Sequence, residues 1–69
     1  MVIRDFTKPE LDRFRENCNF VGSEKVLFEL RSQGVPLEVI AETLDYTYDG
    51  ITKVSRRVNN KIRAVLRQE

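Results

Sequence analysis

Cationic side chains are concentrated in the last third of the chain. Residues 47–69 contain six lysines and arginines against two acids, whereas residues 1–46 contain six against nine. The six cations are Lys53, Arg56, Arg57, Lys61, Arg63 and Arg67. A basic segment attached to an acidic body is typical of a protein that binds nucleic-acid phosphates. A solvated helix surface with no partner would show the same bias, so charge alone leaves both interpretations open.

The residue types argue against catalysis. The sequence contains no histidine, the commonest general base and metal ligand, so neither Ser–His and Cys–His arrangements nor a zinc site are expected. Its one cysteine, Cys18, cannot form an internal disulfide, and we expect a small buried side chain in a reducing compartment. A carboxylate-based or lysine-based active site needs a pocket that so short a chain can hardly enclose. The sequence predicts a protein that is not an enzyme and uses no metal or cofactor.

Length and composition predict one small globular domain. The chain has 69 residues, of which 41% are hydrophobic and 33% charged. Its longest apolar runs are two to three residues, so no transmembrane helix and no membrane partner are expected. No signal peptide is visible, because Arg4, Asp5 and Lys8 crowd the start and no long apolar segment follows. We therefore expect a cytoplasmic location.

Capping and turn residues divide the chain into four expected helices. Thr7 and Glu10 have the spacing of a capping box, and Gly34 suits a helix C-terminus. Asp45 tolerates the left-handed conformation of a tight turn, and Thr47 can cap the helix that follows. Apolar residues recur every three or four positions, without strand-like alternation. The predicted fold class is an all-α, compact four-helix domain within residues 1–69, with helices at about 8–17, 22–33, 36–44 and 48–67.

The last expected helix carries more apolar surface than one neighbour can cover. Its apolar positions are Ile51, Val54, Val58, Ile62, Val65 and Leu66. The preceding helix covers only the first half of this stripe, so the last three residues need another partner. The first helix, with Phe6, Leu11 and Phe14, is one candidate. The alternative is a homodimer through Ile62, Val65 and Leu66.

Four other side chains have expected positions. Val2 and Ile3, at the start of the chain, are available to pack back on the core. Tyr46 continues the apolar pattern around the turn, so we expect it in the core. Glu24 falls on the polar side of the second expected helix and is predicted to face water.

Residues 37–57 predict two helices that cross at a steep angle. The small Ala41 follows Ile40 and is flanked by Leu37 and Leu44, as two closely approaching helices require. This pattern resembles the helix-turn-helix of bacterial and phage DNA-binding proteins. With the two earlier helices, residues 6–62 resemble region four of bacterial sigma factors and related small phage or bacterial regulators. The residues that carry this resemblance are Asn19-Phe20, Leu27 to Arg31, Gly34, Ile40-Ala41, Leu44, Ile51 and Arg56-Arg57.

The resemblance implies that the third helix braces against the DNA backbone and that the last helix enters the major groove of double-stranded DNA. The family positions that face DNA fall on Thr47, Tyr48, Asp49, Thr52, Lys53, Arg56 and Arg57. Helix geometry agrees, because these positions lie opposite the Ile51–Val54–Val58 stripe. Tyr48, Thr52 and Lys53 are predicted to reach base edges. Phosphate or guanine contacts are predicted for Arg56, Arg57, Asn60 and Lys61.

The sequence leaves two functions open. The first is a small sequence-specific transcriptional regulator that binds double-stranded DNA through its helix-turn-helix. The alternative is a non-catalytic interaction module of the same fold, of bacterial or phage origin, that binds RNA polymerase or another regulator. The acidic residues Glu38, Glu42, Asp45 and Asp49 motivate the alternative, because they lie where phosphates would approach. A third interpretation, a self-associating helical scaffold, depends on the apolar end of the last helix.

Overall fold

The computed structural model describes residues 3–67, and the regular structure within this range is entirely helical. A 3-10 helix, η1 (Ile3–Asp5), precedes α1 (Lys8–Asn17), α2 (Ser23–Ser32), α3 (Leu37–Thr43) and α4 (Tyr48–Arg67). The predicted all-α fold is confirmed, and each end of the four expected helices falls within one residue of its predicted position. The sequence did not predict η1.

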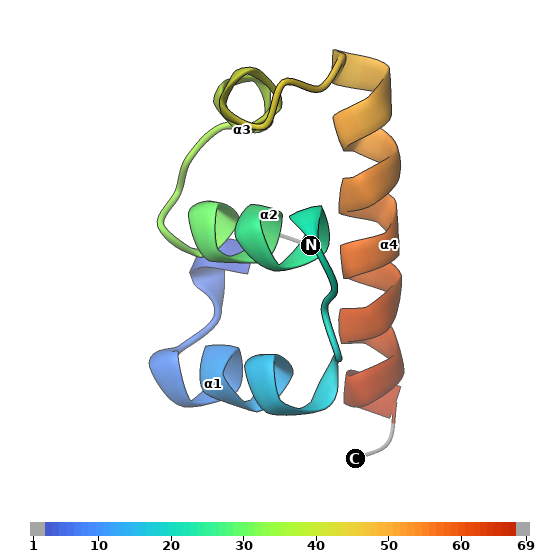
Figure 1. Ribbon diagram of the computed structural model, residues 1–69. Coiled ribbons are helices and arrows are strands. Elements are labelled where there is room, and N and C mark those ends of the chain that lie inside the picture. The colour runs from blue at the N-terminus through green and yellow to red at the C-terminus, as the bar shows by residue number, and fades with distance from the viewer. Residues whose placement is uncertain (1–2, 68–69) are drawn as a thin grey trace.

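The first three α-helices lie one after another along one side of α4 (Figure 1). Helix α1 packs beside the C-terminal half of α4, α2 beside its middle and α3 beside its N-terminal half. The 20 residues of α4 would span about 30 Å, close to the longest dimension of the molecule, 34 Å. Helix α4 is therefore the common support for the other three.

The predicted apolar stripe of α4 forms one wall of the hydrophobic core. Ile51, Val58 and Ile62 are completely buried, and Val54 is 1% exposed. The opposite wall consists of Phe14, Cys18, Leu27, Phe28, Ile40 and Ala41. Aromatic rings join α1 to α2: the Phe14 and Phe28 centroids lie 6.5 Å apart, edge to face, and Phe6 packs on Phe14 in the same way at 4.9 Å, an arrangement that aromatic pairs favour.

This packing favours the first helix over a homodimer as the partner of the apolar end of α4. Ile62 and Val65 are buried within the chain in the same cluster as Phe14, and Leu66 is partly buried against it. Phe6 and Leu11 cover the same cluster, as the intramolecular alternative required. Because α1 already covers Ile62 and Val65, only Leu66 of these three described residues keeps part of its side chain exposed. Ile3 is also buried as expected, whereas Val2 lies outside the described residues.

Local capping explains the helix ends. The Thr7 amide donates to a Glu10 carboxylate oxygen at 2.8 Å, as the predicted capping box requires. At the end of α2, Gly34 has φ +86°, and the amides of Gly34 and Val35 donate to the carbonyls of Arg31 and Leu30. This pair of hydrogen bonds is a Schellman motif, which satisfies carbonyls that the helix itself leaves without partners.

Candidate nucleic-acid interface

The turn between α3 and α4 is a second Schellman motif, closed by an aspartate. Asp45 has φ +60°, as predicted from its position. The Tyr46 amide donates to the Ala41 carbonyl at 2.8 Å, and the Asp45 amide donates to the Glu42 carbonyl at 3.3 Å. These two hydrogen bonds fix the conformation of the turn, and therefore the direction in which the chain leaves α3.

Thr47 caps α4. Its Oγ1 accepts a hydrogen bond of 3.0 Å from the Gly50 amide, the third residue of the helix. A Cβ atom at Gly50 would lie only 3.1 Å from this oxygen. The absence of a side chain at position 50 therefore leaves room for the cap, which accounts for a glycine in the first turn of a helix.

Close packing of α3 on α4 turns the opposite face of α4 outward. Ala41 is 5% exposed, and Ile40 and Ile51 are completely buried where the two helices meet. In Figure 1, α3 is viewed nearly end-on while α4 runs down the picture, so the two helices cross steeply. With Ile51, Val54 and Val58 buried, residues on the other side of α4 face solvent.

The predicted contact residues in the first turns of α4 lie on this outer face, with one partial exception. Tyr48 is 57% exposed, and Asp49, Lys53 and Arg56 are also exposed. Thr52 is half-buried, and its hydroxyl donates to the Tyr48 carbonyl of its own helix at 2.8 Å. Its oxygen remains available as an acceptor, but its proton is already used.

A row of polar side chains extends the outer face toward the end of α4. The spacing of three and four residues places Lys53, Arg56, Asn60, Arg63 and Arg67 on one side of the helix, and all five are exposed. Arg63 donates to the Asn60 amide oxygen at 3.4 Å. Sequence reasoning placed Asn60 in the site but omitted Arg63 and Arg67. Their spacing from Arg56 was the signal that could have found them.

Lys61, for which a phosphate or guanine contact was predicted, is bonded within the chain. Its ammonium group donates to a Glu24 carboxylate oxygen at 2.5 Å and to the Asn19 carbonyl at 3.1 Å. It therefore ties α4 to the start of α2 and to the connector between α1 and α2. Residues 24 and 61 are separated by 37 positions, so no local sequence signal marks the pair.

Glu24 also differs from its sequence-based prediction, since it is 6% exposed and does not face water. The carboxylate oxygen that faces Lys61 also accepts a long hydrogen bond of 3.3 Å from the Val21 amide, and the second oxygen lies 3.6 Å from Arg57 Nε. The hydrogen bond from Lys61 lowers the pKa of Glu24, although burial acts in the opposite direction. A buried carboxylate is stable here because these groups compensate its charge.

Tyr46 is not a core residue, contrary to prediction. It is 39% exposed, and its hydroxyl shares a 2.8 Å hydrogen bond with Ser23 Oγ at the start of α2. The turn directs the ring along the surface, where the phenol oxygen keeps a polar partner. This hydrogen bond links the turn between α3 and α4 to the start of α2.

The surface of α3 is acidic. Glu38 and Glu42 are exposed, Asp45 follows at the turn, and Val39 is 46% exposed beside them. Residues 37–45 include no lysine or arginine. Any bracing of α3 against a DNA backbone would thus lack a cationic side chain from α3 itself.

Two further kinds of feature are missing from the described chain. Residues 3–67 bring together no group of three or more His, Cys, Asp or Glu side chains that could hold a metal ion. Over the same residues, no helix has the length and apolar character needed to cross a membrane.

Comparisons of the chain with known protein families, with curated proteins and with solved structures found no match.

Proposed function

We propose that this chain is a small regulator that binds double-stranded DNA and places the first turns of α4 in the major groove. The observation that carries the proposal is the pair of exposed cations, Lys53 and Arg56, on the outer face of α4. Neither forms an ion pair with another described residue, whereas Lys61 and Arg57 both approach Glu24. Exposed cations that the fold itself does not use are suited to the phosphates of an external partner.

The position of each residue along α4 suggests its role in that complex. Residues at the start of a recognition helix usually reach base edges, so Tyr48, Thr52 and Lys53 would read sequence. Arg56 and Asn60, farther along, would contact phosphates. Asp49 would favour the helix N-terminus and can accept from a cytosine amino group.

Three other predicted DNA-facing residues have more limited roles. Arg57 is 62% exposed and only 3.6 Å from Glu24, so it can reach a phosphate by turning away. Thr47 accepts from Gly50, which leaves its hydroxyl proton free to donate. Lys61 would contribute indirectly, by holding α4 against α2.

The test is the salt dependence of binding to duplexes selected from a random library. Replacing Lys53 and Arg56 together by glutamine should weaken binding and reduce the slope of log K against log salt by about 0.9 for each phosphate that is no longer neutralised. Lys8→Gln, on α1, removes the same kind of charge away from α4 and should leave the slope unchanged. If the wild type binds no duplex in a salt-sensitive manner at low ionic strength, the DNA-binding proposal fails.

The acidic α3 favours a second candidate function, a protein-interaction module. The exposed Val39 between Glu38 and Glu42 offers an apolar surface framed by negative charge, which suits a basic surface on RNA polymerase or another regulator. Calorimetric titration of RNA polymerase would separate the two functions. Affinity that survives Arg56→Gln but disappears on Glu38→Gln with Glu42→Gln would favour the interaction module.

A further inference from the structure

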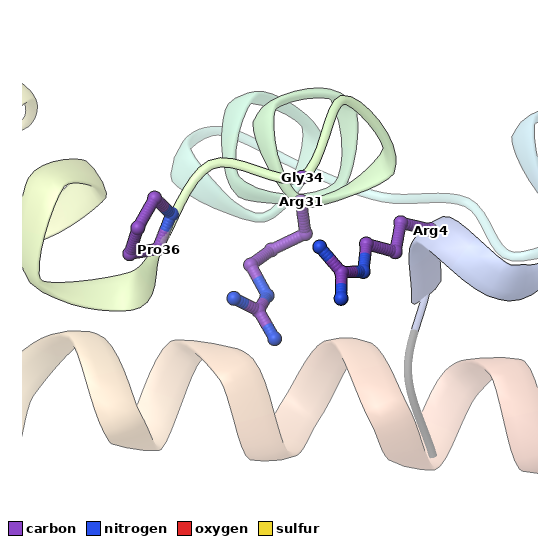
Figure 2. Close-up of a pocket in the computed structure, with 4 residues that line it drawn as sticks. All are labelled: Arg4, Arg31, Gly34 and Pro36. Carbon is purple, nitrogen blue, oxygen red and sulfur yellow. The ribbon is translucent and has the colours of Figure 1, made fainter.

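A pocket with two arginines lies away from the outer face of α4. It has a volume of about 270 Å³ and is lined by Arg4, Arg31, Gly34 and Pro36. Arg4 belongs to η1, Arg31 to the last turn of α2, and Pro36 to the connector before α3. Figure 2 shows both guanidinium groups extending into the same space below the end of α2.

Backbone geometry holds these two side chains in place. Arg31 Nη1 donates to the Val35 carbonyl at 3.2 Å, so its guanidinium is partly fixed while its other N–H groups remain free. The stem of Arg4 lies against Gly34: a Cβ atom there would be 3.7 Å from Arg4 Cδ. The Schellman motif at Gly34 therefore shapes the wall on which both arginines converge.

No carboxylate among the described residues compensates the charges in this pocket. Within residues 3–67 neither Arg4 nor Arg31 forms an ion pair, whereas Arg15 bonds to both Asp12 and Glu29. The position of Arg31 near the C-terminal end of α2 is favourable by itself, because cations interact well with that end of a helix. That effect does not account for Arg4, a second cation from another element that lines the same pocket. Two like charges in one pocket repel each other, and a bound anion would relieve the repulsion.

We propose that this pocket binds a phosphate group. A phosphate monoester carries about −1.5 to −2 charges at pH 7, which matches two guanidinium groups better than a single carboxylate does. Guanidinium donors also suit phosphate oxygens geometrically. A water molecule takes about 30 Å³ of the liquid, so the pocket can hold a phosphoryl group and the first atoms attached to it. Among residues 3–67, those that line the pocket include no large apolar side chain, which disfavours a lipid tail.

The source of the phosphate is either a small phosphorylated molecule, a monoester, or the DNA backbone, a diester with one negative charge per phosphate; guanidinium donors suit the oxygens of both, and the charge match favours the monoester. Because the pocket is separate from the Lys53–Arg56 face, the proposal does not depend on DNA binding by α4. Its test therefore begins without DNA.

The first experiment is an NMR titration of the full chain with phenyl phosphate, compared with sodium chloride at equal ionic strength. We expect saturable shifts of the Gly34 amide and of the arginine Nε–H signals of residues 4 and 31. Arg4→Gln and Arg31→Gln should each weaken binding by at least about tenfold, since each removes a charged hydrogen-bond donor. Lys8→Gln, an exposed cation on α1, should change the affinity less than about twofold.

The variants must keep the wild-type amide spectrum elsewhere. Because Arg4 is exposed, Arg4→Gln should disturb the fold less than Arg31→Gln. Shifts that chloride reproduces, or that persist equally in Arg4→Gln, would count against a phosphate site for a free ligand.

The second experiment measures the salt dependence of duplex binding by the Arg4→Gln, Arg31→Gln double variant. A slope reduced by about 0.9 for each phosphate that is no longer neutralised would assign the phosphate to the DNA backbone. If the salt dependence of duplex binding is unchanged while phenyl phosphate still binds saturably, the phosphate belongs to a small ligand. If neither measurement responds to the two arginines, the pocket proposal is wrong, whatever the outcome at Lys53 and Arg56.

Discussion

The two halves of α4 use similar cations in different ways. In the N-terminal half, Lys53 and Arg56 are exposed and have no carboxylate partner among the described residues. In the C-terminal half, Lys61 is bonded to Glu24 and to the Asn19 carbonyl. The difference lies in what faces each lysine: α2 brings a carboxylate to position 61 and nothing comparable to position 53. The role of a helix cation is thus decided by tertiary neighbours rather than by its own helix.

The apolar face of α4 also packs on different helices in its two halves. The N-terminal half of α4 packs on α3, a helix of only seven residues, whereas the C-terminal half packs on α1. Lys61, in the C-terminal half, helps to assemble the domain, whereas the outer surface around Lys53 and Arg56 remains available for a partner. Substitutions in the two halves should separate these tasks.

The largest effect is expected from Ile62→Ala in the C-terminal half. Ile62 is completely buried, so its truncation should cost about 2–5 kcal/mol. That is comparable with the whole stability of a domain this small. Urea unfolding followed by circular dichroism measures the loss. A change below about 1 kcal/mol would show that the end of α4 is not part of the core.

A smaller but diagnostic loss is expected from Lys61→Met. It leaves the Glu24 carboxylate buried with only Arg57, at 3.6 Å, as a cationic neighbour, which should cost about 1–2 kcal/mol at neutral pH. Thermal unfolding at pH 7 provides the measurement. A variant as stable as the wild type would mean that Lys61 does not hold α4 against α2.

The Glu24–Lys61 pair also predicts how the stability of the fold depends on pH. The pKa of Glu24 is lowered below its usual 4.5 mainly by the hydrogen bond from Lys61, and the pKa of Glu29 is lowered by Arg15. The unfolded chain binds protons more readily at these sites, so the wild type should lose stability as pH falls from about 4.5 through the folded-state pKa values. In Lys61→Met, burial remains without its main compensation, so the pKa of Glu24 should rise. The pH-dependent loss attributable to Glu24 should then shrink, and a folded-state pKa above 4.5 would turn it into a gain as pH falls. Unfolding curves between pH 3 and pH 7, roughly the range over which carboxylates titrate, would show the difference.

The smallest effect on stability is expected from Lys53→Met, the matched substitution in the other half. Lys53 is exposed and has no ion pair within the described chain, so the free energy of unfolding should change by less than about 0.5 kcal/mol. The same urea unfolding assay measures it beside Lys61→Met. A loss as large as that of Lys61→Met would abolish the contrast between the two halves of α4.

Signals within a few residues explain what could be predicted from the sequence. Thr7, Gly34, Asp45 and Thr47 act on their immediate neighbours, so helix boundaries could be derived from them to within one residue. The buried stripe of α4 followed from helical spacing, and the surplus apolar surface at Ile62 pointed to α1 as one of its two possible partners.

Features that depend on distant neighbours could not be predicted in this way. The Glu24–Lys61 pair joins residues 37 positions apart, and each side chain taken alone fits a polar helix surface. Tyr46 has an apolar ring in a turn, so its direction depends on how the turn is closed. The convergence of Arg4 and Arg31 requires η1, which the sequence did not reveal. The assignment of α4 to DNA stays a prediction.

The cap at the start of α4 has a consequence for attempts to make this protein more heat-resistant. A routine search for helix-weakening residues would select Gly50, because alanine is favoured over glycine inside helices by about 1 kcal/mol. Here the added methyl group would press on the Thr47 hydroxyl, at 3.1 Å, and the cap would have to shift. An engineer would do better to leave position 50 alone and to replace Asp45 with glycine, the residue that the backbone at φ +60° accepts without strain.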